Sequence, residues 1–344
     1  MSHPDSQFVI ATPPFAKRPV DTPAIMRHVI YALVPVMMAA VFFFGMSAVL
    51  ILVVCTGTCM LLEWLLTGRG NLRDSPVSDG SAAVTGILLA LTLPPGLPLW
   101  MAALGSAVAI LFGKLLFGGL GQNVFNPSLT GRAFLQACFP VALTTWAPQG
   151  GPAAFLVLRG DTFALPLVRP VFDGVSAATP LARMKFDSEL TDLGSLLYGS
   201  IPGSLGETSA VLILLGGAYL GWRRFLNWRI PVGIFLTVFL FASALNLIDP
   251  GRFPDGLHHL LSGGLVLGAV FMATDPVSSP VTPRGMWVFA FGIGVLVILI
   301  REFGGLPEGV MYAILLMNAA TPLIDRITQP GIYGALEDRA RGGD

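Results

Sequence analysis

Long apolar runs constrain the fold of this chain more than any other feature of its sequence. A helix that crosses a lipid bilayer needs roughly 20 mostly apolar residues, and about ten such runs occur here. They lie near residues 26–46, 47–67, 81–94, 97–117, 128–145, 208–222, 230–248, 258–274, 285–302 and 308–325. Only 12% of the residues are charged, against about 25% in ordinary soluble domains. We therefore predict an all-α polytopic membrane protein with about ten transmembrane helices.

Two of the runs are interrupted, and we predict that they form broken helices. The third run stops at Pro94 and Pro95, and the eighth contains Gly263, Gly264 and Gly268. They occupy matching places if the chain consists of two five-helix units. Several motifs also recur in the same order, namely Asp79-Gly80 with Asp255-Gly256, Thr92-Leu93-Pro94 with Thr274-Asp275-Pro276, Trp100 with Trp287, and Phe117-Gly118-Gly119-Leu120 with Phe303-Gly304-Gly305-Leu306.

Because five is an odd number, the second unit enters the membrane from the opposite side. The sequence thus predicts two inverted repeats with broken helices. In such folds a polar ligand or ion binds near the bilayer midplane, where half-helices supply unpaired backbone groups.

The basic residues predict the orientation of the chain. With the amino terminus in the cytoplasm, most lysines and arginines face the cytoplasm, including the cluster of Arg223, Arg224 and Arg229, as the positive-inside rule requires. The predicted division is a cytoplasmic segment 1–24, a first repeat 25–145, a periplasmic loop 146–207, a second repeat 208–328 and a cytoplasmic tail 329–344. Acidic and basic residues balance at 20 each, so nucleic acid is excluded as a partner.

Ionisable residues inside apolar runs are costly and need partners or water. Glu63, Lys114 and Asp325 lie near predicted cytoplasmic ends, and we expect their side chains to extend to the interface. Asp275 lies at the broken eighth run, where either helix capping or ion handling would explain it. No spacing of cysteines indicates a metal site, and we assign no catalytic residue.

Two polar segments stand beside the apolar runs. The glycine-rich segment 118–127 carries Asn123 and Asn126, whose carboxamides suit the edge of a heterocycle, although turn formation and helix capping would also explain them. The outward loop contains Asp173-Gly-Val-Ser-Ala-Ala-Thr-Pro-Leu181. Pro180 holds Thr179 away from helical geometry, so a modifying enzyme could reach its hydroxyl, but the residues alone indicate only a turn.

Taken together, these motifs resemble the RnfD/NqrB family, the flavin-carrying membrane subunits of Rnf and sodium-pumping quinone reductase complexes. The loop motif is similar to the family's Ser-Gly-Ala-Thr flavinylation site. The resemblance implies that Thr179 carries FMN through a phosphoester, and that Asp173, Ser176 and Ala178 are recognised by the FMN transferase. Ala177 stands where the family usually has glycine. In the quinone-reductase branch a non-covalent riboflavin is associated with an Asn-x-x-Asn pair, which maps to Asn123 and Asn126.

The short segment before the first run favours the Rnf branch, whose complex exchanges electrons between ferredoxin and NAD⁺ and moves Na⁺ or H⁺ across the bacterial inner membrane. The resemblance implies other membrane and flavoprotein subunits as partners, besides the membrane lipid. We place an ion pathway around Asp275 and Glu207. The alternatives are an NqrB-type subunit, a solute channel or transporter with the same inverted repeats and no redox chemistry, and a structural scaffold.

Overall fold

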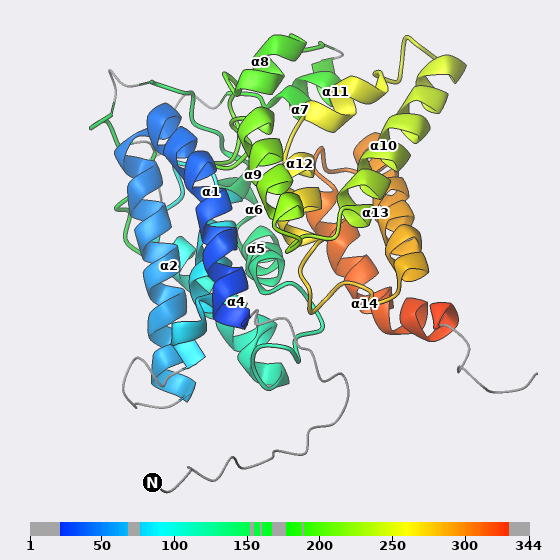
Figure 1. Cartoon of the computed structure of the whole chain (residues 1–344). Helices are drawn as coiled ribbons and strands as arrows, with labels where there is room; N and C mark the ends of the chain where they lie inside the picture. The colour runs from blue at the N-terminus through cyan, green and yellow to red at the C-terminus, as the bar shows by residue number, and fades with distance from the viewer. Residues whose placement is uncertain are drawn as a thin grey trace, which may run out of the picture.

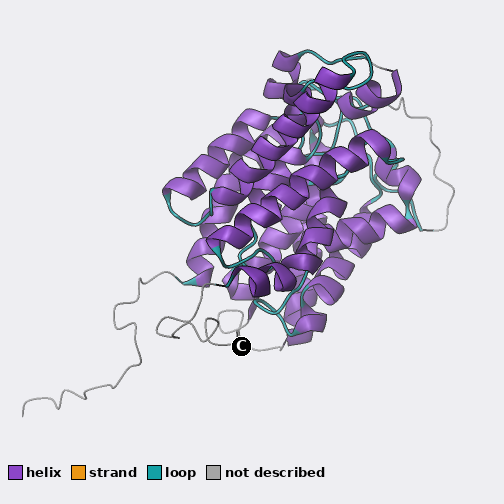
Figure 2. Cartoon of the chain, turned by 90° about the vertical axis from the view of Figure 1, so that its right-hand side faces the viewer, coloured by secondary structure: helices purple, strands orange, loops and turns teal. Residues whose placement is uncertain are grey.

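The computed structural model describes residues 21–67, 76–151, 155–158, 160–166, 177–187 and 189–329. Within these ranges all regular structure is helical and no strand forms (Figure 2). This confirms the predicted all-α class. Two of the residues assigned to transferase recognition, Asp173 and Ser176, lie outside the described residues.

The first half of the chain opens with two long apolar helices, α1 (Thr22–Phe44) and α2 (Met46–Thr67), which meet at Gly45. Gly45 has a left-handed backbone with φ of 64°, and a Cβ there would lie 2.4 Å from the carbonyl oxygen of Phe155. Only glycine fits this turn without strain. The elements that follow are η1 (Pro76–Asp79), α3 (Ser81–Leu91), α4 (Leu99–Gly113), η2 (Leu115–Phe117), α5 (Pro127–Cys138) and α6 (Pro140–Thr144).

A connecting segment of short elements leads to the second half. Its helices are α7 (Pro180–Ala182), η4 (Arg183–Asp187) and α8 (Leu193–Tyr198). The second half then contains α9 (Ala210–Trp222), α10 (Arg229–Ile248), α11 (Gly256–Leu261), α12 (Leu265–Leu267), η5 (Gly268–Met272), α13 (Pro283–Phe303) and α14 (Val310–Thr328).

Each of the ten predicted runs contains helix. Within the described residues, six helices are long and apolar enough to cross a membrane: α1, α2, α4 extended through η2, α10, α13 and α14. Helices α3 and α9 are apolar but shorter. The third run ends before Pro94 as predicted, and the eighth is divided among α11, α12 and η5. The fifth run is also broken, because Pro140 starts a new helix directly after Phe139, and this break was not predicted.

The helices of the two halves pack in the same pattern. In the first half α2 packs on α3 and α4, and α4 packs on α5; in the second half α10 packs on α11 and α13, and α13 packs on α14. Across the halves α1 packs on α9 and α5 packs on α14. Contacts between corresponding helices are what a pseudo-two-fold axis between two repeats produces.

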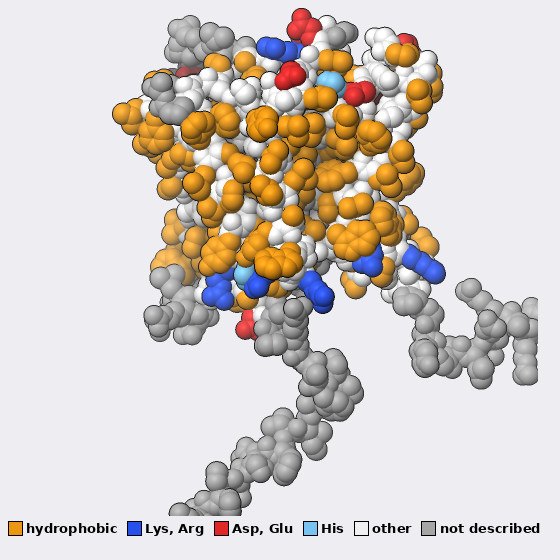
Figure 3. Space-filling view, turned by 45° about the horizontal axis from the view of Figure 1, so that its top comes forward, with side chains coloured by type: hydrophobic (Ala, Val, Ile, Leu, Met, Phe, Trp, Pro, Cys, Tyr) orange, Lys and Arg blue, Asp and Glu red, His pale blue; other side chains and the backbone are white. Residues whose placement is uncertain are grey.

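Different segments of the chain lie at the two ends of the molecule. The first turn of α1 and the last turn of α14 lie at the lower end in Figure 1, whereas α7, α8 and α11 lie at the upper end. On the face shown in Figure 3, hydrophobic side chains cover a broad band across the middle, and basic side chains line the lower edge. The chain is therefore a multi-pass membrane protein whose connecting segment lies at the end opposite to the start of α1.

Candidate functional site

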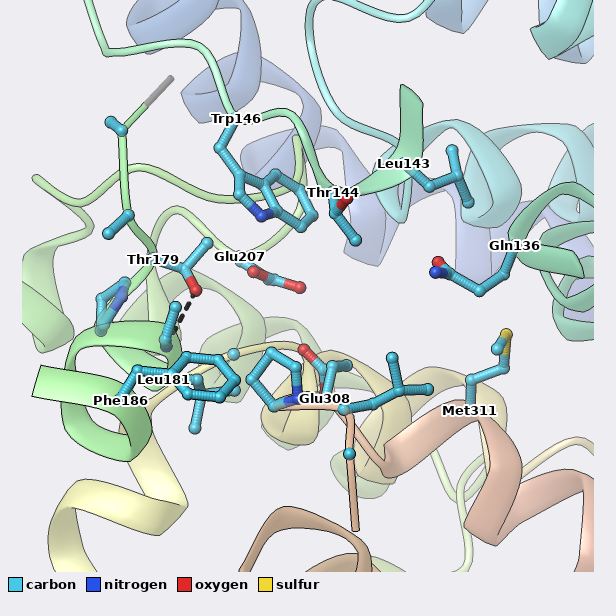
Figure 4. A pocket seen from close by; sticks show the side chains of 18 of the residues that line it. Gln136, Leu143, Thr144, Trp146, Thr179, Leu181, Phe186, Glu207, Glu308 and Met311 are labelled. Atoms are coloured by element: carbon cyan, nitrogen blue, oxygen red, sulfur yellow. Dashed lines mark hydrogen bonds between the residues drawn. The ribbon is translucent and has the colours of Figure 1, made fainter. Parts of the chain in front are cut away.

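A cavity of about 380 Å³ lies at the upper end, where the connecting segment meets both halves of the chain. We call it the upper cavity. Side chains from α5, from the connecting segment and from the start of α14 line it (Figure 4). Those used below are Arg132, Trp146, Thr179, Phe186, Glu207 and Glu308. Its volume falls within the range of roughly 300–1,000 Å³ that is typical of small-molecule sites.

Thr179 lies in the wall of the upper cavity as the residue that caps α7. Its backbone is extended, with φ of −69° and ψ of 158°, because Pro180 follows it. Its Oγ1 atom accepts a hydrogen bond from the backbone N–H of Ala182 at 3.2 Å. The side chain is 7% exposed, so the hydroxyl is held at a defined place beside the cavity. The neighbouring Ala178 is exposed.

The connecting segment is fixed to the second half by Lys185. The Nζ atom of Lys185 donates hydrogen bonds to the carbonyl oxygens of Arg301 and Gly304, both at 2.6 Å, and of Leu306 at 3.2 Å. These carbonyls belong to the end of α13 and the turn after it, where helices leave backbone acceptors unpaired. Partial burial lowers the pKa of Lys185. One side chain thus anchors η4, and with it Thr179, against α13.

The walls and floor of the upper cavity differ in chemistry. Trp146 and Phe186 supply aromatic surface, and Figure 4 shows Trp146 close to Thr179. The side chain of Arg132 on α5 lines the cavity and is largely buried. A planar, partly apolar molecule with an anionic group would match this combination, since aromatic surface accepts its ring and a guanidinium binds phosphate or carbonyl oxygens.

Two carboxylates form the floor of the upper cavity. Glu207 Oε2 accepts from the backbone N–H of Ser204 at 3.3 Å, and Glu308 Oε2 accepts from that of Gly264 at 3.2 Å. The remaining oxygen of each, Oε1, is buried without a hydrogen-bond partner. Burial, and then the charge of Glu308, raise the pKa of Glu207 to about 7.

A second pocket lies toward the lower end, beside the first turn of α1, and is lined in part by Asn123, Asn126 and Asp275. We call it the lower pocket; its volume is about 90 Å³. Asn126 caps α5, because its Oδ1 accepts from the N–H groups of Ser128 at 3.0 Å and Leu129 at 3.3 Å. Asp275 caps its own turn: Oδ1 accepts from Val277 N–H and Oδ2 from the Ser278 hydroxyl.

Asn126 also joins the two halves of the chain. Its Nδ2 donates to the carbonyl oxygen of Met272 at 3.1 Å. Its backbone N–H donates at 3.1 Å to the side-chain oxygen of Asn318, in the amide orientation that also lets Asn318 donate to Ile314. We call these contacts the central bonds. The side chain of Asn126 is held by these bonds, whereas Asn123 Oδ1 is buried without a hydrogen-bond partner. At about 90 Å³ the lower pocket is too small for a riboflavin ring as it stands.

The structure separates residues that the sequence analysis placed in one ion pathway. Glu207 lies in the upper cavity and Asp275 in the lower pocket. A small cavity of about 20 Å³ shares Arg132, Glu207 and Glu308 with the upper cavity and reaches Met272. The sequence analysis did not connect Glu308 or Arg132 with Thr179. Glu308 had one signal, its place two residues after the second Phe-Gly-Gly-Leu motif, but Arg132 had none.

The expectation that Glu63 and Lys114 extend to the interface was wrong. Their side chains are 1% and 2% exposed and form an ion pair with each other. Lys114 Nζ also donates to the hydroxyl of Ser81 at 2.5 Å. Asp325, in contrast, is partly exposed and accepts from the backbone N–H of Val281 at 3.1 Å. The pair satisfies the charges inside the bundle, where neither side chain can reach water.

Comparison with known proteins places these observations in a family. Residues 9–334 match the model of the NQR2, RnfD, RnfE family. The D-type subunit of the ion-translocating oxidoreductase complex of Stutzerimonas stutzeri is 43% identical over 334 residues, which cover 90% of this chain and 91% of that protein. The D-type subunit of the proton-translocating ferredoxin:NAD(+) oxidoreductase complex of Clostridium ljungdahlii is 39% identical and covers 95% of this chain and 96% of its own length.

Proposed function

The chain belongs to the NQR2, RnfD, RnfE family, and we propose that it is the RnfD member of an Rnf-type complex, which couples ferredoxin:NAD⁺ oxidoreduction to ion translocation. The names of the two relatives support this assignment over nearly the whole chain. Other membrane and flavoprotein subunits of the complex are then its partners. The ion is Na⁺ or H⁺.

We further propose that Thr179 carries FMN through a phosphoester to its hydroxyl. The observation that carries this proposal is the place of that hydroxyl, fixed in the wall of the upper cavity beside aromatic surface and a buried guanidinium. FMN in this place would supply reversible electron transfer. Trp146 and Phe186 would hold the ring system, and Arg132 would stabilise negative charge on the group. Asp173, Ser176 and Ala178 stay predictions as transferase recognition residues.

The chain itself would organise the site in three ways. Lys185 keeps the Thr179 segment against α13. The apolar walls limit water in the cavity, which strengthens charge interactions inside it. Glu207 and Arg132 place a carboxyl group and a guanidinium within the same cavity. A group on Thr179 would therefore have its electrostatic surroundings set by this chain.

For the localisation we propose the bacterial inner membrane, with both termini in the cytoplasm and the upper cavity at the periplasmic face. Arg223, Arg224 and Arg229 lie between α9 and α10 or at the start of α10, and basic residues line the end at which α1 starts (Figure 3). This distribution supports the orientation through the positive-inside rule. An FMN transferase that acts on Thr179 would then work outside the cytoplasm.

We propose that ions pass between the upper cavity and the lower pocket, with Glu207 and Asp275 at the two ends. The small cavity that reaches Met272 supports this route, because it extends the upper cavity toward η5. Asn126 and Met272 form the wall between this cavity and the lower pocket. Asn123 and Asn126 as riboflavin residues stay a prediction that the lower pocket does not favour.

The test is mass spectrometry of the peptide that contains Thr179, after expression together with the FMN transferase. We expect wild-type protein to show the mass of an attached FMN and a fluorescent flavin band on a denaturing gel. Thr179→Val should lose both signals. Thr144→Val is the matched control, because it removes another hydroxyl from the same cavity. A flavin band that persists in Thr179→Val would refute the attachment and leave a transporter without redox chemistry as the better explanation.

A further inference from the structure

The floor of the upper cavity contains an arrangement that the proposed covalent group does not explain. Glu207 comes from the loop before α9, and Glu308 from the loop before α14. Each carboxylate uses only its Oε2 atom in a hydrogen bond to the backbone. The Oε1 atom of each is buried and has no hydrogen-bond partner among the described residues; that of Glu308 forms an ion pair with Arg301 at 3.8 Å.

The two Oε1 atoms face the same place. A Cβ built on Gly264 would lie 3.3 Å from Glu207 Oε1 and 3.9 Å from Glu308 Oε1. The adjacent Gly263 has a φ of 70°, and a Cβ there would lie 2.8 Å from Glu308 Oε2. The absence of side chains at this glycine pair is therefore what allows the carboxylates to converge. Figure 4 shows both carboxylates directed into the cavity below Thr179.

None of the basic side chains nearby donates a hydrogen bond to the Oε1 atom of Glu207 or Glu308. Arg301 on α13 directs Nη1 to the carbonyl oxygen of His259 and Nη2 to that of Ser262. Its Nη2 atom is 3.8 Å from Glu308 Oε1, which is beyond hydrogen-bond length. Arg132 on α5 acts on Glu207 through its charge and lowers the pKa of that carboxyl, but burial and Glu308 act in the opposite direction and outweigh it.

The other charged groups at this end are engaged elsewhere. Glu302 pairs with His259 at 3.1 Å, and Lys185 bonds to backbone carbonyls. Each of the two carboxylates keeps one oxygen buried without a hydrogen-bond donor, and like charges that lie close together favour the protonation of one of them. A metal cation would need more ligands than two oxygens, and the described residues contain no group of three or more acidic, histidine or cysteine side chains that could hold one.

We propose that Glu207 and Glu308 form a carboxyl pair that shares one proton and exchanges it with the upper cavity beside Thr179. The pair holds the proton on one carboxyl at a time while the other stays ionised, and the proton leaves to water in the cavity. The ion is then H⁺, and the glutamate pair is its site within the ion translocation proposed above. Only the use of the proton in translocation rests on that proposed function. Protonation itself does not depend on the presence of FMN.

The experiment is a pH titration of the full-length protein in lipid nanodiscs, followed by infrared difference spectroscopy. The band of a protonated carboxylic acid shifts in heavy water, which identifies it without any substitution. We expect wild-type protein to show one buried carboxylic acid that loses its proton near neutral pH. Glu207→Gln should abolish this component. Glu308→Gln should move its midpoint down by about one pH unit, because the like charge is gone.

Two controls separate this proposal from others. Glu189→Gln removes an exposed carboxylate at the same end of the molecule and should leave the titration unchanged. Sodium chloride and choline chloride at equal concentration should give the same midpoint. If the carboxylic acid band is lost in sodium chloride but not in choline chloride, the pair is a sodium site. If the midpoint is unchanged in Glu308→Gln, Glu207 titrates alone. Either result overturns the proposal that the two glutamates share one proton.

Failure of the proton pair and failure of the FMN attachment give different results. Thr179→Val protein, which lacks the attachment point, should show the same titrating carboxylic acid, because the two glutamates are unchanged in it. If the band is present and the flavin absent, only the FMN proposal fails. If the flavin is present and no carboxylic acid titrates near neutral pH, only the proton pair fails.

Discussion

Replacing Lys114 by methionine tests how the buried ion pair contributes to stability. Lys114 and Glu63 are 2% and 1% exposed, and Lys114 also donates to Ser81, whose hydroxyl in turn donates to Asp79. Lys114→Met keeps the length of the side chain but leaves the Glu63 charge without its partner. Breaking a buried pair from one side costs about 3–5 kcal/mol, so we expect the free energy of unfolding to fall by that amount.

The double variant Lys114→Met/Glu63→Leu removes both charges and should recover most of this loss, to within about 1 kcal/mol of wild type. Unfolding by denaturing detergent, followed by circular dichroism, compares wild type, Lys114→Met, Glu63→Leu and the double variant. Arg326→Met, at an exposed position of α14, is the control for loss of a cation. A single variant as stable as wild type, or a double variant no better than the single, would refute this account of the pair.

Three further predictions concern the two cavities. The pKa of Glu207 is raised from 4.5 to about 7. The stabilisation by its protonated carboxyl is therefore fully present below pH 4.5 and is lost as the pH rises through about 7. Thermal unfolding should show this pH dependence, and Glu207→Gln should flatten the dependence. Lys185→Met removes three hydrogen bonds to the end of α13, and limited proteolysis should then cut the connecting segment at least several-fold faster. Asn126→Ala removes the cap of α5 and should lower stability by about 0.5–2 kcal/mol, whereas Asn126→Asp, which keeps the capping oxygens, should lose less.

The helix positions were predictable because apolar length is a local property of the sequence. Every predicted run contains helix, and the glycines of the eighth run mark the place where η5 replaces a continuous helix. The break at Phe139 was missed because the apolar run continues through Pro140, and run length alone does not register one proline.

Partners that are distant in the sequence could not be predicted in the same way. Glu63 and Lys114 each look like a residue near a helix end, and only the packing of α2 against α4 shows that their charges meet. Likewise, Glu207 and Glu308 belong to different parts of the chain, and nothing local indicates that their carboxylates both lie close to Gly264. The extended backbone of Thr179 was predictable because Pro180 follows it, but the helix that starts after it was not, since the residues alone indicated only a turn.

The central bonds limit how this molecule can move. Asn126 bonds to Met272 and Asn318 where the two halves of the chain meet. Rocking one half as a rigid body against the other would break these bonds. We therefore expect access to alternate through displacements of the short helices η4, α11 and η5, while the long helices remain a stationary frame.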